Sequence, residues 1–147
     1  MPKIKTLKQS AIFNTLSDRE LALFSRIISE EEFIQDTVLV AENMKSDKFY
    51  LIEKGGVGIV SGKLEGSQEL ILSEGDSFGE WALLAPPHLT SIAAKVTETA
   101  RILVLEKDDF DRFSKEEPAI ALKIVLGVIR SLWSSIREVE KMLKESL

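Results

Sequence analysis

Glycine is concentrated in one part of the chain, and this restricts what the middle of the chain can form. Seven of the eight glycines lie between Gly55 and Gly79. Short runs rich in β-branched and aromatic residues surround these glycines, at Val38–Val40, Phe49–Ile52, Val57–Val60, Glu69–Leu72, Ser91–Val96 and Ala100–Leu105. Many short strands broken by glycine-rich turns predict an antiparallel sandwich or jelly roll, with Lys63–Ser67 as a hairpin tip.

Helical patterns flank this region on both sides. Ser17 and Glu20 have the spacing of a capping box, which predicts a helix over Asp18–Ile28. A short helix is expected over Asp108–Phe113, and Pro118 suits the first turn of a long final helix. Apolar residues of this last helix alternate in steps of three and four over three heptads, at Leu122, Val125, Ile129, Leu132, Ile136, Val139 and Leu143.

This final apolar seam has two interpretations. A long amphipathic helix packed on its own sheet would show the same period. However, Leu126, Val128 and Trp133 add apolar surface beyond the seam. One face can therefore pack on the domain while the seam forms a homodimer, and we expect this arrangement.

Composition excludes several classes of function. The sequence has no Cys, which removes disulfides, iron–sulfur clusters and thiolate zinc sites, and His88 is the only His. We therefore expect no metal site and no enzymatic activity of the kind that jelly-roll metal enzymes show. The net charge is −5, so we expect no binding to nucleic acid. Apolar runs are short and no signal peptide is visible, which predicts a cytoplasmic protein that does not contact a membrane.

One segment indicates an anion site. Gly75–Gly79 is followed by Glu80 and then by a short helical pattern at Trp81–Leu84. Free amides at the start of a helix bind anions, and a carboxylate beside them accepts a hydrogen bond from a sugar hydroxyl. This chemistry suits a ligand with one phosphate and one ribose.

The segment Phe78–Leu84 resembles the phosphate-binding cassette of cyclic-nucleotide-binding domains, of the catabolite-activator and cyclic-AMP-dependent kinase regulatory-subunit type. The family motif is Phe-Gly-Glu-x-Ala-Leu-x. Phe49–Gly55, Asp109–Phe110 and Pro118 are similar to further family positions. The resemblance implies one mainly β domain with flanking helices over residues 1–147. It has N-terminal helices at 1–30, an antiparallel β jelly roll at 31–106, and C-terminal helices with a long final one at 107–147.

The resemblance also implies roles for individual residues. Glu80 would bind the ribose 2′-hydroxyl, although a helix-capping carboxylate is the alternative. The backbone amides of Gly79, Ala82 and Leu83 would face the cyclic phosphate. No cofactor other than a cyclic or related nucleotide is expected.

The chain departs from the family where the phosphate-binding Arg belongs. Between Gly79 and Lys95 there is no Arg or Lys, and Thr90, followed by Ser91, occupies the Arg position. A hydrogen bond to a charged group contributes roughly 1.5–3 kcal/mol, so its loss weakens binding by roughly ten- to a hundredfold. Thr90 and Ser91 can offer only hydroxyls. Strand alternation from Thr90 predicts that Lys95 points away from the pocket.

Four further residues are candidates near the ligand. Trp81 is either a core residue or narrows the pocket. His88 is a surface residue, a protonated phosphate contact or a haem ligand. In the family the long C-terminal helix often closes over the base, so Trp133 would stack on a purine and Ser135 would meet its edge. Packing of Trp133 against the barrel is the alternative.

Two functions remain open from the sequence. The first is a regulatory module that senses a cyclic or related nucleotide, binds it weakly, and acts on a partner through its C-terminal helix. The second is a ligand-independent module for dimerisation or protein contact, with a vestigial pocket. The missing Arg favours the second function, whereas the intact Phe78–Glu80 motif favours the first.

Overall fold

Helices gather on one side of a curled antiparallel sheet in the computed structural model, which describes residues 2–61, 69–86 and 88–146. The predicted hairpin tip at Lys63–Ser67 lies outside the described residues. The helices are α1 (Pro2–Gln9), α2 (Asp18–Phe24), α3 (Trp81–Leu84), α4 (Lys107–Glu116) and α5 (Pro118–Ser146). The strands are β1 (Ser29–Phe33), β2 (Val38–Val40), β3 (Lys48–Ser61), β4 (Leu70–Leu72), β5 (Ser77–Phe78) and β6 (Ile92–Glu106).

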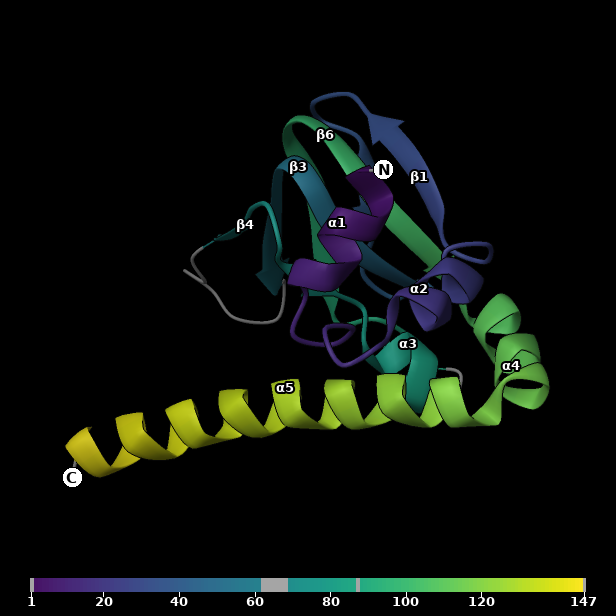
Figure 1. Cartoon of the computed structure of the whole chain (residues 1–147). Coiled ribbons are helices and arrows are strands. Elements are labelled where there is room, and N and C mark those ends of the chain that lie inside the picture. Colours follow the sequence, from purple (N-terminus) through teal and green to yellow (C-terminus); the bar gives the residue numbers. More distant parts are fainter. Residues whose placement is uncertain (1, 62–68, 87, 147) are drawn as a thin grey trace.

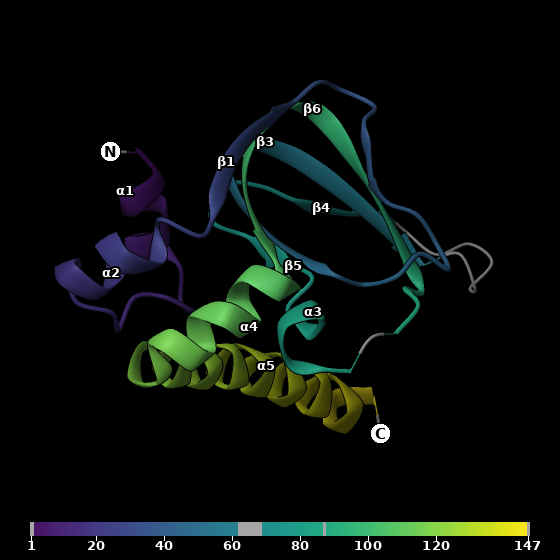
Figure 2. The same ribbon diagram turned by 90° about the vertical axis from the view of Figure 1, so that its right-hand side faces the viewer.

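The sheet is organised around its two long strands. Its order is β1-β6-β3-β4, while β2 also pairs with β6 and β5 with β3, all antiparallel. Figure 2 shows the strands curling into a roll above α3, α4 and α5. The predicted fold class, an antiparallel roll with flanking helices and a long C-terminal helix, is confirmed.

The strand boundaries differ from the prediction. The runs predicted at Ser91–Val96 and Ala100–Leu105 both belong to one continuous strand, β6, and β1 was not predicted. Phe49–Ile52 and Val57–Val60 belong to one continuous strand, β3, rather than two. The β3–β6 pairing shifts its register between Ile52 and Val57, so β3 continues through the glycines that suggested a break. Gly55 has φ +98, and a Cβ there would lie 2.6 Å from the Cα of Ala100, so the close approach of the two strands requires glycine.

The predicted capping box opens α2. The Ser17 hydroxyl accepts from the Glu20 amide at 3.2 Å, and Glu20 Oε1 accepts from the Ser17 amide at 2.9 Å. The helix ends at Phe24 rather than at Ile28, because the chain turns there to begin β1 at Ser29. Lys123 of α5 donates to Glu20 Oε1 at 2.8 Å, and this bond lowers the pKa of the Glu20 carboxyl. The cap therefore also ties α5 to α2.

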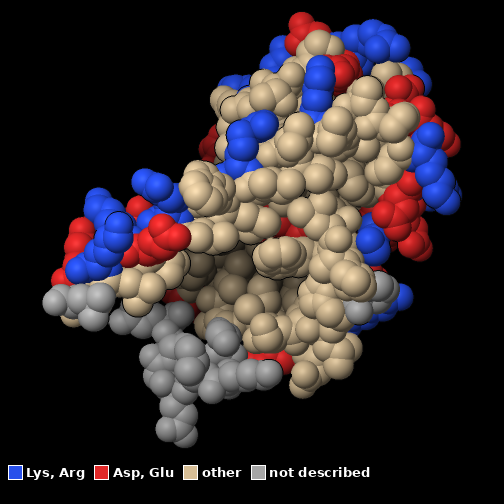
Figure 3. Space-filling model, turned by 90° about the horizontal axis from the view of Figure 1, so that it is seen from below, with Lys and Arg blue, Asp and Glu red and all other residues tan. Residues whose placement is uncertain are grey.

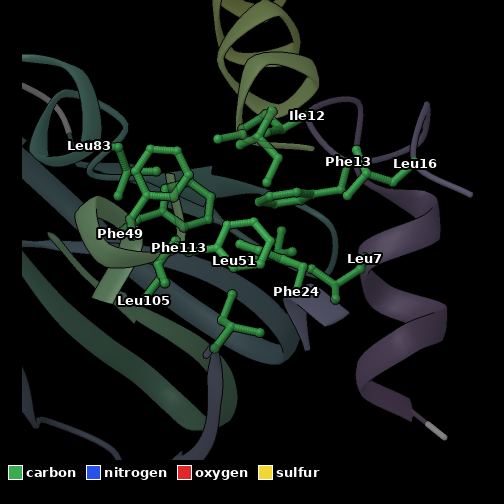
Figure 4. Close-up of a cluster of buried hydrophobic side chains, with 14 of the residues drawn as sticks. Leu7, Ile12, Phe13, Leu16, Phe24, Phe49, Leu51, Leu83, Leu105 and Phe113 are labelled. Atoms are coloured by element: carbon green, nitrogen blue, oxygen red, sulfur yellow. The ribbon is translucent and has the colours of Figure 1, made fainter. Parts of the chain in front are cut away.

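Two apolar clusters hold the domain together. One fills the roll itself, and the other lies between the sheet and the helices. Figure 4 shows the second cluster, in which side chains from the N-terminal helical region, the sheet and α4 meet. The Phe13 and Phe24 rings stack at 5.0 Å, and Phe49 meets Phe13 edge-on at 5.9 Å. Burial of such rings stabilises this interface.

The α5 helix packs on this cluster through its first half. Ile120, Ile124 and Val128 are buried against the domain. A Cβ on Gly127 would lie 2.1 Å from the Ile12 carbonyl oxygen, so only glycine permits this close approach of the helix to the N-terminal region. Beyond Leu132 the helix is exposed, and Figure 1 shows it extending past the sheet toward the C-terminus.

The heptad seam lies away from the packed face of α5. Val125 and Leu132 are half-buried at its edge. The other five seam residues are exposed, namely Leu122, Ile129, Ile136, Val139 and Leu143. Leu126, Trp133 and Met142 are exposed as well. The helix thus has one face on the domain and a second apolar face without cover in the described part of the chain.

By length and composition alone, α5 could also cross a membrane. Its most apolar 18-residue window has a mean hydropathy of 1.6, and 28% of that window is buried. Burial of Ile124 and Val128 and the Lys123–Glu20 ion pair hold the helix on the domain. We therefore interpret its apolar content as packing surface.

Candidate functional site

A cavity of about 310 Å³ lies beside the predicted cassette. One of its walls forms where the chain after β2 pairs with the segment before β6. Ser46 donates its amide to the His88 carbonyl, and Thr90 donates to the Met44 carbonyl, each at 2.8 Å. The lining residues are Leu39, Val40, Met44, Lys45, Ser46, Asp47, Lys48, Tyr50, Phe78, Gly79, Trp81, His88, Leu89, Thr90, Ser91 and Ile92.

The floor of this cavity is aromatic. The rings of Tyr50 and Phe78 stack at 4.7 Å with an interplanar angle of 13°. The Tyr50 hydroxyl donates to the Leu39 carbonyl at 3.4 Å. Burial, with the nearby charges of Asp47 and Glu31, raises the pKa of Tyr50 to about 12. The phenol therefore stays neutral at physiological pH and adds no charge to the floor.

The cassette turn presents Gly79 to the cavity. Gly79 has φ +85, and a Cβ there would lie 2.5 Å from the Lys48 carbonyl oxygen, so this turn requires glycine. The amides of Ala82 and Leu83 donate within the turn to Gly79 and Glu80 at 3.0 and 3.1 Å. Both residues are buried, and neither lines the cavity. Of the three amides implied for the phosphate, only that of Gly79 belongs to a lining residue.

Glu80 lies on the other side of the cassette. Its Oε1 accepts a hydrogen bond of 2.6 Å from the Ser77 hydroxyl. Glu80 lines a second cavity of about 330 Å³, together with Ser131, Leu132 and Ser135 of α5. The carboxylate makes no capping bond to α3, so the helix-capping interpretation is wrong. In this structure Glu80 faces the long helix rather than the first cavity.

Thr90 and Ser91 both line the first cavity, next to His88. The Thr90 hydroxyl donates to the Ala41 carbonyl at 2.7 Å, so the wall itself uses this donor. His88 is exposed, and its Nδ1 lies 3.0 Å from the Pro86 carbonyl oxygen. Lys95 does not line the cavity and pairs with Asp36 at 3.5 Å.

The two tryptophans lie apart. Trp81 lines the first cavity and is 55% exposed, so the interpretation as a core residue is wrong. Trp133 is 59% exposed and lines neither cavity, and the Arg137 guanidinium carbon lies 5.9 Å from its ring centroid. Its packing against the barrel is therefore not observed. Ser135, the other residue predicted to meet the base, lines only the second cavity.

Sequence reasoning missed two cations of the first cavity, Lys45 and Lys48. Lys48 is the first residue of β3, directly before the predicted run Phe49–Ile52. Lys45 lies in a segment without an alternating apolar pattern, which therefore gave no sign of a strand. The bridge between Lys45 and Leu89 brings this segment to the cassette side. Only the antiparallel pairing of these two loops shows that Lys45 lies at the cavity, and this pairing cannot be read from the sequence.

One buried carboxyl group lies outside both cavities. Glu53 of β3 is 8% exposed, and its Oε2 has no hydrogen-bond donor among the described residues. Arg101 Nη1 lies 3.9 Å from Glu53 Oε1, and Arg101 Nε lies 3.9 Å from Glu30 Oε1. Burial raises the pKa of Glu53 to about 7, and Glu30 adds to this rise while Arg101 opposes it.

This raised pKa predicts a pH-dependent stability. The protonated Glu53 carboxyl stabilises the fold fully below its ordinary pKa of 4.5, and this contribution is lost as the pH rises through about 7. Glu53→Gln should therefore raise the free energy of unfolding at pH 8 by about 1–3 kcal/mol, with little change at pH 5. Urea unfolding across this pH range measures the effect. The exposed Glu98→Gln on β6 is the matched control, and equal curves for both variants would contradict the prediction.

Residues 30–117 match the family model of the cyclic nucleotide-binding domain. The chain belongs to this family. Two of its relatives are a cGMP-dependent protein kinase of Caenorhabditis elegans, 24% identical over 109 residues, and a cAMP-dependent protein kinase regulatory subunit of Debaryomyces hansenii, 30% identical over 114 residues. The matches cover 72% and 70% of this chain but only 14% and 25% of those proteins.

Solved structures of the cyclic nucleotide-binding family share the fold of this chain. A cyclic nucleotide-binding domain from Methylobacillus flagellatus matches with a TM-score of 0.83 at 18% identity, covering 99% of this chain and 83% of that one. The catabolite activator protein of Thermus thermophilus matches with a TM-score of 0.72 at 23% identity, covering 90% and 63%. At these identities the likeness concerns the fold.

Proposed function

We propose that this cyclic nucleotide-binding domain is a non-catalytic regulatory module that binds cyclic AMP and cyclic GMP weakly or not at all. The observation that carries the proposal is the makeup of its cavity. Thr90 stands where the family motif has Arg, and the Glu80 carboxylate lies with Ser77 outside the cavity. The cavity lining therefore lacks the Arg and the carboxylate that the motif implies for phosphate and for ribose.

A route from the cassette to α5 supports a regulatory role. The second cavity separates Glu80 from Ser131 and Ser135 of the long helix. A ligand that drew Glu80 toward the first cavity would break its bond to Ser77 and change the surface that meets α5. The position of α5 would then report on the cavity.

The partner that we propose for α5 is a second copy of the chain. Its exposed seam follows the heptad period of a coiled coil and continues past the part of the helix that packs on the domain. The homodimer would act in the cytoplasm, without nucleic acid or membrane as a partner. The same exposed seam favours the alternative function, in which dimerisation proceeds without any ligand.

Calorimetric titration with cyclic AMP and cyclic GMP tests the first function. We expect dissociation constants in the high micromolar range or weaker, since the charge-assisted phosphate contact is missing. A weak but saturable heat supports a ligand-binding module. Complete absence of heat at millimolar nucleotide favours the ligand-independent dimer, and submicromolar binding would contradict the proposal of weak affinity.

A further inference from the structure

The rim of the first cavity carries large apolar side chains that the protein leaves open. Met44, Trp81 and Leu89 all line it and are 46%, 55% and 65% exposed. The stacked rings of Tyr50 and Phe78 continue this apolar surface inward. On the face seen in Figure 3, a hollow opens beside α5, and the described residues around it are mostly uncharged. A flat apolar molecule would cover such surface and gain hydrophobic free energy.

The charges of the same cavity favour an anion. Lys45 and Lys48 line it, against one carboxylate, that of Asp47. Neither lysine forms an ion pair within the part of the chain that the structure describes. The protein as a whole carries a net charge of −5, so the excess of positive charge in this cavity is opposite in sign to the net charge of the chain. An anionic group entering here meets ammonium groups that no side-chain carboxylate occupies.

The cavity offers little for a sugar. The Glu80 carboxylate that would accept from a ribose hydroxyl lies in the other cavity, and the Thr90 hydroxyl is used by the Ala41 carbonyl. Besides Ser46, Asp47, His88 and Ser91, the lining that remains is an aromatic floor and rim with a cationic edge.

We propose that this cavity binds a small aromatic monoanion without a sugar, such as an aryl carboxylate. Its ring lies against Trp81, and its charged group lies beside Lys45 and Lys48. The inference rests on the proposed function, in which this cavity is the ligand site of the module. Such a ligand has one carboxylate in place of the phosphate of a cyclic nucleotide, and a flat apolar ring without a ribose.

Calorimetry with 2-naphthoate and its neutral analogue 2-naphthamide tests the ligand class on the wild-type protein. Carboxylate and amide have nearly the same shape, but the amide is neutral and has an NH2 donor in place of one acceptor oxygen, so their difference reports the anionic acceptor. We expect 2-naphthoate to bind at least about tenfold more tightly than 2-naphthamide, as one charge-assisted contact implies. Equal affinities would overturn the proposal, and this comparison needs no variant to fold.

Variants locate the binding. Trp81→Ala should weaken 2-naphthoate binding by about tenfold, because one face of the ring contact is lost. Lys45→Gln combined with Lys48→Gln should weaken it by a similar factor while leaving 2-naphthamide unchanged. The matched controls lie on the exposed part of α5. They are Trp133→Ala for the tryptophan variant, and the double variant Lys141→Gln with Lys144→Gln for the lysine variant. Circular dichroism confirms that each variant is folded.

The outcomes separate this inference from the proposed function. Binding that responds to Trp81 and the cavity lysines but not to the controls supports the inference. Binding of cyclic AMP without binding of 2-naphthoate overturns the inference and leaves the proposed function intact. Absence of binding by both compounds overturns the inference and, for the proposed function, favours the ligand-independent dimer. Binding of 2-naphthoate that none of the cavity variants weakens places the ligand elsewhere and also overturns the inference.

Discussion

Ile136→Glu is expected to convert the protein from a dimer into a monomer. Ile136 lies in the exposed half of α5, at a central position of the seam, and is 52% exposed in the single chain. A coiled-coil dimer would bury it against its counterpart. Burying a carboxylate costs several kcal/mol even after relaxation, so a loss of about 3 kcal/mol or more is expected. This corresponds to about a hundredfold or greater rise in the dimer dissociation constant.

Light scattering across a concentration series measures this change. The wild type should show twice the chain mass of 16.4 kDa, and Ile136→Glu should show the mass of one chain at the same concentrations. Ser134→Glu is the matched control, because it adds the same charge two residues away on the helix face opposite the seam. Ile136 is remote from the buried residues of α5, so the Ile136→Glu substitution should not change the fold of the domain.

Two results would contradict the dimer. The first is a monomeric wild type at high micromolar concentration, and the second is an Ile136→Glu variant that still dimerises. If a monomeric wild type floats with phosphatidylcholine vesicles, the uncovered face of α5 instead meets a lipid surface.

The sequence predicted those parts of the fold that depend on residues close together in the chain. The capping box at Ser17 and Glu20 gave the start of α2, since both of its bonds involve residues three apart. The step pattern in α5 grouped the seam residues on one face, since helix geometry alone fixes which residues share a face. It did not identify the packed face, because only Val128 is buried among Leu126, Val128 and Trp133. The glycine cluster indicated a β region correctly but divided β3 in two, because the pairing with β6 that carries the strand past Gly55 is a long-range contact.

The candidate site depended on contacts that the sequence does not encode locally. The motif Phe78–Glu80 placed the cassette turn, and Gly79 adopts the positive φ that the motif suits. It did not reveal that Ser77 would hold the Glu80 carboxylate on the α5 side. Likewise, the segment containing Lys45 reaches the cavity only by pairing with the segment around Leu89. The direction of a side chain and the pairing of two irregular segments both follow from packing across the whole domain.

Thr90→Arg is expected to raise the affinity for cyclic AMP. Thr90 lies in the cavity wall where the family motif has Arg, across from Met44 and close to the cassette turn. Arg at this position loses the hydrogen bond that the Thr90 hydroxyl donates to the Ala41 carbonyl. Its longer side chain extends a guanidinium toward the space beside Gly79. A charge-assisted hydrogen bond contributes about 1.5–3 kcal/mol, so the affinity should rise by about tenfold or more.

Calorimetry with cyclic AMP on the wild type and three variants measures this gain. Thr99→Arg is the matched control, because it makes the same substitution at an exposed position of β6 outside the cavity and should leave the affinity unchanged. Adding Glu80→Ala to Thr90→Arg then tests the ribose contact that the family motif implies. The gain persists if the carboxylate stays with Ser77, and it falls if the carboxylate turns into the cavity when the nucleotide binds. An equal rise in the Thr99→Arg control would show that added positive charge raises the affinity regardless of position, and would contradict the prediction. No rise in Thr90→Arg would show that the missing Arg does not limit nucleotide binding and that Trp81 or the segment before Thr90 obstructs the cavity instead.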